Sequence, residues 1–89
     1  MKYHAVPNIK SDRAQLIKLI PSTSALRTFD ALAKKLGSSR EEIGRNIGSK
    51  GEVLIWAFTR GKSPRAEELR VKALVEIDRL IEEQMAVAA

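Results

Sequence analysis

Residues 39–64 read SREEIGRNIGSKGEVLIWAFTRGKSP, and this stretch decides the expected fold. Ser39 and Ser49 are each followed, three residues later, by a glutamate. This spacing is that of a capping box, in which the two side chains satisfy free amide groups at the start of a helix. Gly48 and Gly61 stand where each of the two segments ends. The stretch therefore predicts two short helices joined by a tight turn.

Apolar side chains at three- and four-residue steps predict a helix on either side of this stretch. Upstream, the helix begins at Ser22 or Ser24 and runs to Leu36, and Gly37 follows where a left-handed C-cap belongs. Downstream, Ser63 and Pro64 suit the N-cap and the first helical position of a long helix that runs to about Gln84. The apolar stripe of this last helix is broader than one small domain can cover, so we expect it to form a dimer interface.

The N-terminal part of the chain has weaker signals. Residues 1–10 lack helical periodicity and contain Pro7, so we expect an arm in extended form. Residues 11–20 suit a short helix with Ala14, Ile17 and either Leu19 or Ile20 inward. The apolar run LIKLI within them is also compatible with a strand, because periodicity does not separate the two at this length.

The run VLIWAF, residues 53–58, is apolar on every face. A helix of this kind is buried on both sides, either in a core or against a partner chain. A strand is the alternative, since several of these residue types favour sheets. We expect an all-α fold, a bundle of four to five helices within residues 11–84, with a long C-terminal helix and a frayed tail at residues 85–89.

The composition restricts the classes of function. The 89 residues carry a net charge of +5, with the excess of bases in residues 1–62 and an excess of acids after them. A one-sided basic domain suits a polyanionic partner. The chain has no cysteine and no long apolar run, which predicts a cytoplasmic protein without a membrane partner. No catalytic set, metal-ligand cluster or phosphate loop is recognisable, so we expect neither an enzyme nor a cofactor.

A helix-turn-helix needs a small residue where its helices pack, a glycine in the turn and an apolar anchor in the second helix. The chain has this spacing twice. The upstream copy makes residues 39–47 the recognition helix and uses Ala33, Gly37 and Ile43. The downstream copy makes residues 50–60 the recognition helix and uses Gly44, Gly48 and either Leu54 or Ile55.

The downstream copy resembles the Cro/phage-repressor (XRE-type) helix-turn-helix DNA-binding domain over roughly residues 24–80. SREEIGRNIG resembles the first motif helix of that family, and SKGEVLIWAFTRGKSP resembles its recognition helix and the following R-G-K-x-P exit. The resemblance implies a dimeric helical bundle that binds operator DNA and regulates transcription. Two features depart from the family pattern: one extra residue between the two glycines, and a run, VLIWAF, that has almost no polar face.

The candidate DNA contacts are drawn from both copies: Ser39, Arg40, Arg45, Asn46, Ser49, Lys50, Glu52, Arg60 and Lys62. The resemblance places the first turn of the downstream recognition helix near base edges, and Arg60 and Lys62 near phosphates. The expected partners are double-stranded DNA and a second copy, bound through the C-terminal helix and residues 53–58.

The sequence is also compatible with two other functions. One is a helical protein–protein interaction module, such as an assembly subunit, adaptor or antitoxin-like partner, with no DNA readout. The other is a ribbon-helix-helix repressor, whose strand would be the run QLIKLI ahead of Pro21.

Overall fold

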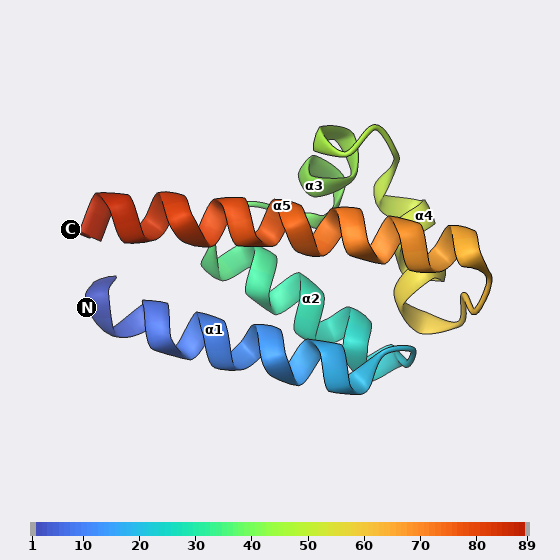
Figure 1. The fold of residues 1–89 in the computed structure, drawn as a ribbon, viewed down its shortest axis with the longest axis horizontal. Coiled ribbons are helices and arrows are strands. Elements are labelled where there is room, and N and C mark those ends of the chain that lie inside the picture. The colour runs from blue at the N-terminus through green and yellow to red at the C-terminus, as the bar shows by residue number, and fades with distance from the viewer. Residues whose placement is uncertain (1, 89) are drawn as a thin grey trace.

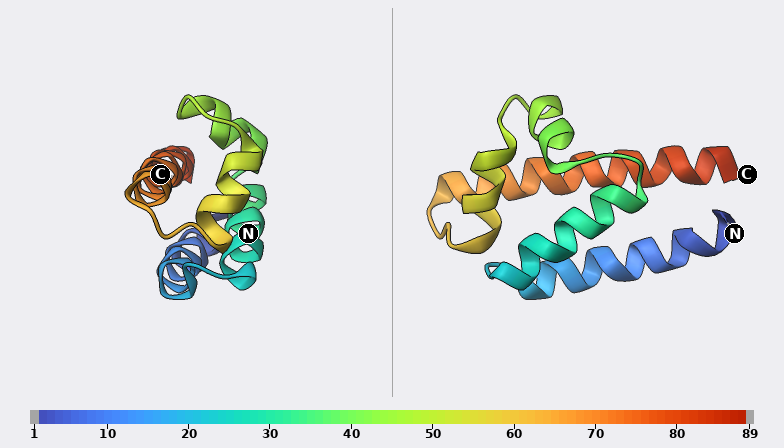
Figure 2. Two further views of the ribbon diagram at one scale, coloured as in Figure 1. Left: turned by 90° about the vertical axis from the view of Figure 1, so that its right-hand side faces the viewer. Right: turned by 180° about the vertical axis from the view of Figure 1, so that it is seen from behind.

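The computed structural model describes the backbone of residues 2–88 and the side chains of residues 9–86. It contains five helices: α1 (Lys2–Leu19), α2 (Thr23–Lys35), α3 (Arg40–Asn46), α4 (Gly51–Thr59) and α5 (Pro64–Ala88). The long helices α1 and α5 run in opposite directions, α2 lies between them, and the short helices α3 and α4 pack beside α5 (Figure 1). The end-on view in Figure 2 shows α5 on one side of the bundle. The predicted all-α fold with a long C-terminal helix is confirmed.

All five helices contribute to one main core. Its largest side chains include Phe29 of α2 and Phe58 of α4, which are fully buried and stack with their ring centroids 4.6 Å apart. Offset aromatic pairs of this kind add stabilisation beyond the area that they bury. The run VLIWAF lies within the helix α4, so the alternative of a strand is wrong, and the ring pair packs this helix against α2.

The N-terminal prediction is wrong. Residues 2–10 are helical and continue into residues 11–19 as one helix, so neither an extended arm nor the strand of a ribbon-helix-helix is present there. Among residues 9–19 of α1, Ile9 and Leu16 are buried and Leu19 packs against the core, whereas Ala14 and Ile17 face solvent. The two buried residues are seven positions apart and share one helix face. Packing of that face onto the core outweighs the low helix propensity of the local sequence.

The ends of the other helices agree more closely with the predictions. α2 begins after its N-cap Ser22, whose hydroxyl oxygen accepts a hydrogen bond from the amide of Ala25 at 3.0 Å. α5 continues to Ala88, four residues beyond the predicted end at Gln84. Residues 85–88 are therefore helical and do not form the predicted frayed tail. Across residues 2–88, no helix has both the length and the apolar character that crossing a membrane requires.

The connections α2–α3 and α3–α4 have the same backbone form. Gly37 and Gly48 adopt φ values of 74° and 77°, which residues with a side chain rarely do. In each turn the residue after the glycine donates its amide to a carbonyl oxygen of the preceding helix. Ser38 donates to Ala33 at 2.8 Å, and Ser49 donates to Gly44 at 2.7 Å. This is the Schellman ending of a helix. The two predicted glycine turns are therefore confirmed.

The two predicted capping boxes differ in outcome. The hydroxyl oxygen of Ser39 accepts from the amide of Glu42 at 3.2 Å, so α3 begins as predicted. The predicted capping box at Ser49 is wrong, because the N-cap of α4 is Lys50, whose side chain makes no capping hydrogen bond. Ser49 belongs to the preceding turn, in which its amide closes the Schellman motif. The helix therefore begins one residue later than the serine–glutamate spacing indicates.

The end of α4 is held by α5. One guanidinium nitrogen of Arg70, Nη1, donates to the carbonyl oxygens of Ala57 and Gly61, both at 2.7 Å. Gly61 leaves no room for a side chain, since a Cβ atom there would lie 2.5 Å from the Cβ of Ala66. These contacts fix the short loop between α4 and α5.

Candidate nucleic-acid interface

Helices α3 and α4 cross at a point where neither has a side chain. A Cβ atom on Gly44 would lie 2.8 Å from the backbone nitrogen of Gly51 and from the carbonyl carbon of Lys50. Leu54, one turn further along α4, is fully buried, whereas Ile55 is half-buried. The small residue, the turn glycine and the apolar anchor of the downstream copy are thus in place, with Leu54 as the anchor.

The upstream copy meets the same spacing requirements, because Ala33 and Ile43 are fully buried. Two of its candidate contacts, however, are used within the fold. Arg40 donates from Nε and Nη2 to the two carboxylate oxygens of Asp30, at 3.0 and 2.7 Å. This hydrogen-bonded pair raises the pKa of Arg40 and ties α3 to α2. We therefore do not retain Arg40 as a candidate DNA contact.

Asn46 is also used within the fold. Its amide nitrogen donates to Glu76 of α5 at 2.8 Å, and Arg79 donates to the same carboxylate at 2.9 and 2.7 Å. Glu76 is 8% exposed, and the pKa of its carboxyl is lowered, chiefly by the hydrogen bonds from Arg79 and further by that from Asn46. The network fixes the C-terminal end of α3 on α5, so Asn46 is not retained as a DNA contact either.

Some of the remaining candidates are brought together at the α3–α4 turn. A shallow depression of about 300 Å³ is lined by Arg45, Ser49, Lys50 and Glu52, together with Glu41 and Gly51. The charged side chains among them are exposed. This surface, which we call the turn site, therefore combines two cationic donors with two carboxylate acceptors.

Arg60 and Lys62 lie at the other end of α4. Both are exposed, and they follow the last turn of a nine-residue helix, which spans about 13 Å. Figure 1 shows that α4 leads from the α3 side of the molecule to the beginning of α5. The structure therefore divides the candidates into the turn site and a second, basic group in the α4–α5 loop. Ser39 belongs to neither, since its hydroxyl caps α3.

The turn site also contains Glu41, which the upstream copy presents on its recognition helix but which is not among the candidate DNA contacts. Glu41 lines the depression, and its Cα would lie 3.2 Å from a Cβ atom on Gly51. Its position four residues before Arg45, on the same face of α3, was the available signal. The spacing of the motif did not reveal it, because Glu41 comes near α4 only through the close crossing of the two helices.

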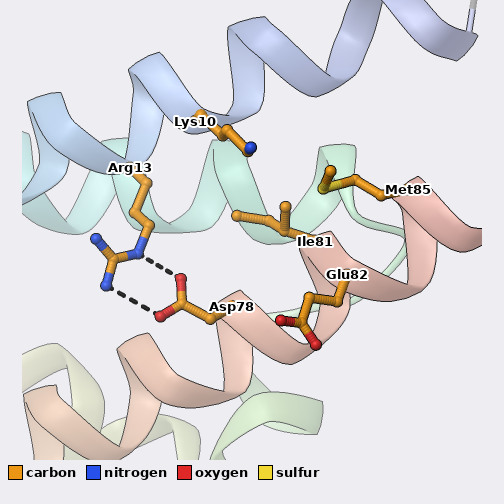
Figure 3. A pocket seen from close by; sticks show the side chains of 6 residues that line it. All are labelled: Lys10, Arg13, Asp78, Ile81, Glu82 and Met85. Carbon is orange, nitrogen blue, oxygen red and sulfur yellow. Dashed lines mark hydrogen bonds and ion pairs between the residues drawn. The ribbon is translucent and has the colours of Figure 1, made fainter.

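A larger depression, of about 700 Å³, lies between α1 and α5 (Figure 3). Arg13 and Asp78 form an ion pair across it, with 2.6 Å between Nε and Oδ1, and Lys10 projects toward the apolar side chains of Ile81 and Met85. The lining holds no nucleophile paired with a base. Within the described part of the chain, no group of three or more His, Cys, Asp or Glu residues is arranged to hold a metal ion.

No protein-family model, curated protein or solved structure matches this chain.

Proposed function

We propose that this protein binds double-stranded DNA in a sequence-specific manner, as a dimeric transcriptional regulator of the phage- or plasmid-repressor type. The observation that carries the proposal is the α3–α4 unit, with backbone contact at Gly44, a left-handed Gly48 and a buried Leu54. A helix-turn-helix of this form places the N-terminal residues of its second helix in the major groove. In this protein those residues border the turn site.

The chemistry of the turn site fits base edges better than a row of phosphates. Arg45 and Lys50 are the donors that pair with the two acceptors of guanine, and Glu52 is an acceptor for the amino group of cytosine. On a surface that contacts only phosphates, the two carboxylates would repel the ligand. The mixture of donors and acceptors therefore supports base reading at this end of α4.

Arg60 and Lys62 supply the contacts that carry no sequence information. Both are exposed cations in the loop after α4, and contacts to phosphates set the register of a protein on a duplex. The net charge of +5 adds a general attraction to the polyanion. Affinity should therefore fall with salt, with a slope that grows by about 0.9 for each phosphate contact.

The apolar middle of α4 limits the number of base pairs that one copy of the protein can contact. Val53, Ile55 and Trp56 are half-buried, and the hydroxyl of Thr59 donates to the carbonyl oxygen of Ile55 within the helix. The first turn of α4 therefore supplies the polar side chains for the groove. One copy then contacts few base pairs, and each correct pair contributes about 1–3 kcal/mol of discrimination. A second copy on an adjacent half-site doubles that contribution, which is the physical reason for proposing a dimer.

The test uses a duplex recovered by selection from a random-sequence pool. Arg45→Ala and Lys50→Ala should each weaken binding to it by about tenfold to a hundredfold, measured by fluorescence anisotropy. Lys34→Ala is the matched control, since Lys34 is an exposed lysine of α2 that does not line the turn site. It should bind nearly as the wild type does. If no duplex is enriched, or if both turn-site variants bind as tightly as the control, the proposal is wrong.

A further inference from the structure

The outer face of α5 has two exposed valines. Val71 and Val75 are 54% and 61% exposed, and their four-residue spacing places them side by side on the helix. They border a groove of about 310 Å³ whose opposite side includes the half-buried Ile47 of α3. The core-facing residues of α5, such as Ala73 and Ile77, lie on the other side of the helix. The two valines therefore form an apolar strip without a partner within the described residues.

The charges at the two ends of this strip have opposite sign. Glu68 lies three residues before Val71, and Arg79 lies four residues after Val75, so all four share the outer face. The side chains of Glu68 and Arg79 are 62% and 51% exposed. The strip is therefore apolar in the middle, with the carboxylate of Glu68, paired with Lys72 at 3.2 Å, toward the start of α5 and the guanidinium of Arg79, paired with Glu76 and Glu83, toward its end.

We propose that a second copy of this chain packs antiparallel on the strip, about a two-fold axis near residue 73. In this register Val71 faces the partner's Val75, and Glu68 faces the partner's Arg79. Each contact occurs twice, as the symmetry of an isologous interface requires. A parallel arrangement would set like charges against each other, so charge complementarity selects the antiparallel copy as the occupant. The inference rests on the dimer of the proposed function, but it does not require DNA.

Arg79 can take part without giving up its contacts within the chain. A guanidinium has five N–H donors, and three hydrogen bonds lead from Arg79 to Glu76 and Glu83. Two N–H groups therefore remain for a carboxylate of the partner. The bonds to Glu76 also hold the guanidinium in place, which reduces the entropy lost when the partner binds.

The first test is sedimentation of the full chain without DNA over a range of concentrations. The wild type should dimerise, and Val75→Asp should weaken dimerisation by at least about tenfold, because each interface would bury two new carboxylates. Ile17→Asp is the matched control: Ile17 is 46% exposed on α1, so the same loss of an exposed apolar side chain occurs outside the strip. It should leave dimerisation unchanged. Circular dichroism checks that both variants fold.

The second test concerns the orientation of the two copies. Glu68→Arg and Arg79→Glu should each weaken self-association, whereas an equimolar mixture of the two should associate again, because opposite charges then meet at both ends. A wild-type chain that stays monomeric at all concentrations overturns the interface together with the dimer. A dimer that Val75→Asp leaves intact overturns the interface alone. DNA binding is measured separately on the selected duplex, so its failure is distinguishable from both results.

Discussion

The substitution Gly44→Ala tests the close crossing on which the proposed DNA-binding unit depends. In an open helical site it would stabilise the protein, because alanine is favoured over glycine by about 1 kcal/mol in a helix interior. Here the new Cβ atom would meet two backbone atoms at 2.8 Å, those of Lys50 and Gly51. Backbone atoms cannot turn away as a flexible side chain does, so α3 and α4 must move apart.

The magnitude follows from two opposing contributions. Overpacking by one methyl group costs about 1–3 kcal/mol, and a contact with backbone belongs to the upper part of that range. Subtracting the gain in helix propensity, about 1 kcal/mol, leaves a net loss of about 1–2 kcal/mol. For a domain of this size, each kcal/mol corresponds to roughly 4–8 °C in Tm. Gly44→Ala should therefore lower Tm by about 4–16 °C.

Thermal unfolding followed by circular dichroism measures this change. Gly48→Ala is the comparison, because Gly48 has open space around it and a φ of 77°, so a methyl group there adds backbone strain without a clash. That strain should cost about 1–2 kcal/mol. DNA binding distinguishes the two variants. At a similar loss of stability, Gly44→Ala should weaken DNA binding more than Gly48→Ala does, because it separates the two helices that form the turn site. A Gly44→Ala protein with an equal or higher Tm would refute the close crossing.

Two further predictions concern the polar contacts of α5. The carboxyl of Glu76 has a folded-state pKa below its ordinary value of 4.5, so its stabilisation is present at neutral pH and is lost as the pH falls below 4.5. The free energy of unfolding, measured by urea titration at several pH values, should therefore depend less on pH in that acidic range for Glu76→Gln than for the wild type. An unchanged dependence would contradict the role of Glu76. Arg70→Met removes both hydrogen bonds to the end of α4 and should cost about 2 kcal/mol in the same measurement at neutral pH, whereas a loss below about 0.5 kcal/mol would show that the two bonds contribute little.

Local signals in the sequence were sufficient for the helices whose ends they mark. The glycines at 37 and 48 and the capping serine at 39 act on backbone groups within a few residues, so their effect can be read without knowing the fold. The start of α4 was misplaced because two local motifs compete for Ser49, and the turn takes it. A spacing rule considers one motif at a time and does not decide between two.

The rest of the fold and of the site depends on contacts between distant residues. α1 is held by the burial of Ile9 and Leu16 on other helices, which the sequence around Pro7 does not indicate. Arg40 and Asn46 looked free because their partners lie 10 and 30 residues away in the sequence. A polar residue that joins helices and one that awaits a ligand have the same local pattern. Only the structure distinguishes them.

The hydrogen bonds from Arg70 to the carbonyl oxygens of Ala57 and Gly61 restrict how far Lys62 can extend toward a ligand. With the carbonyl of Gly61 held by α5, the loop backbone cannot swing outward, and the reach of Lys62 is limited to the length of its own side chain. A duplex seated on the first turn of α4 must therefore also pass close to the opposite end of that helix for both groups of contacts to form together. Under the proposed function, the distance between these two points, about the length of α4, limits the curvature and groove width of a duplex that could make both groups of contacts.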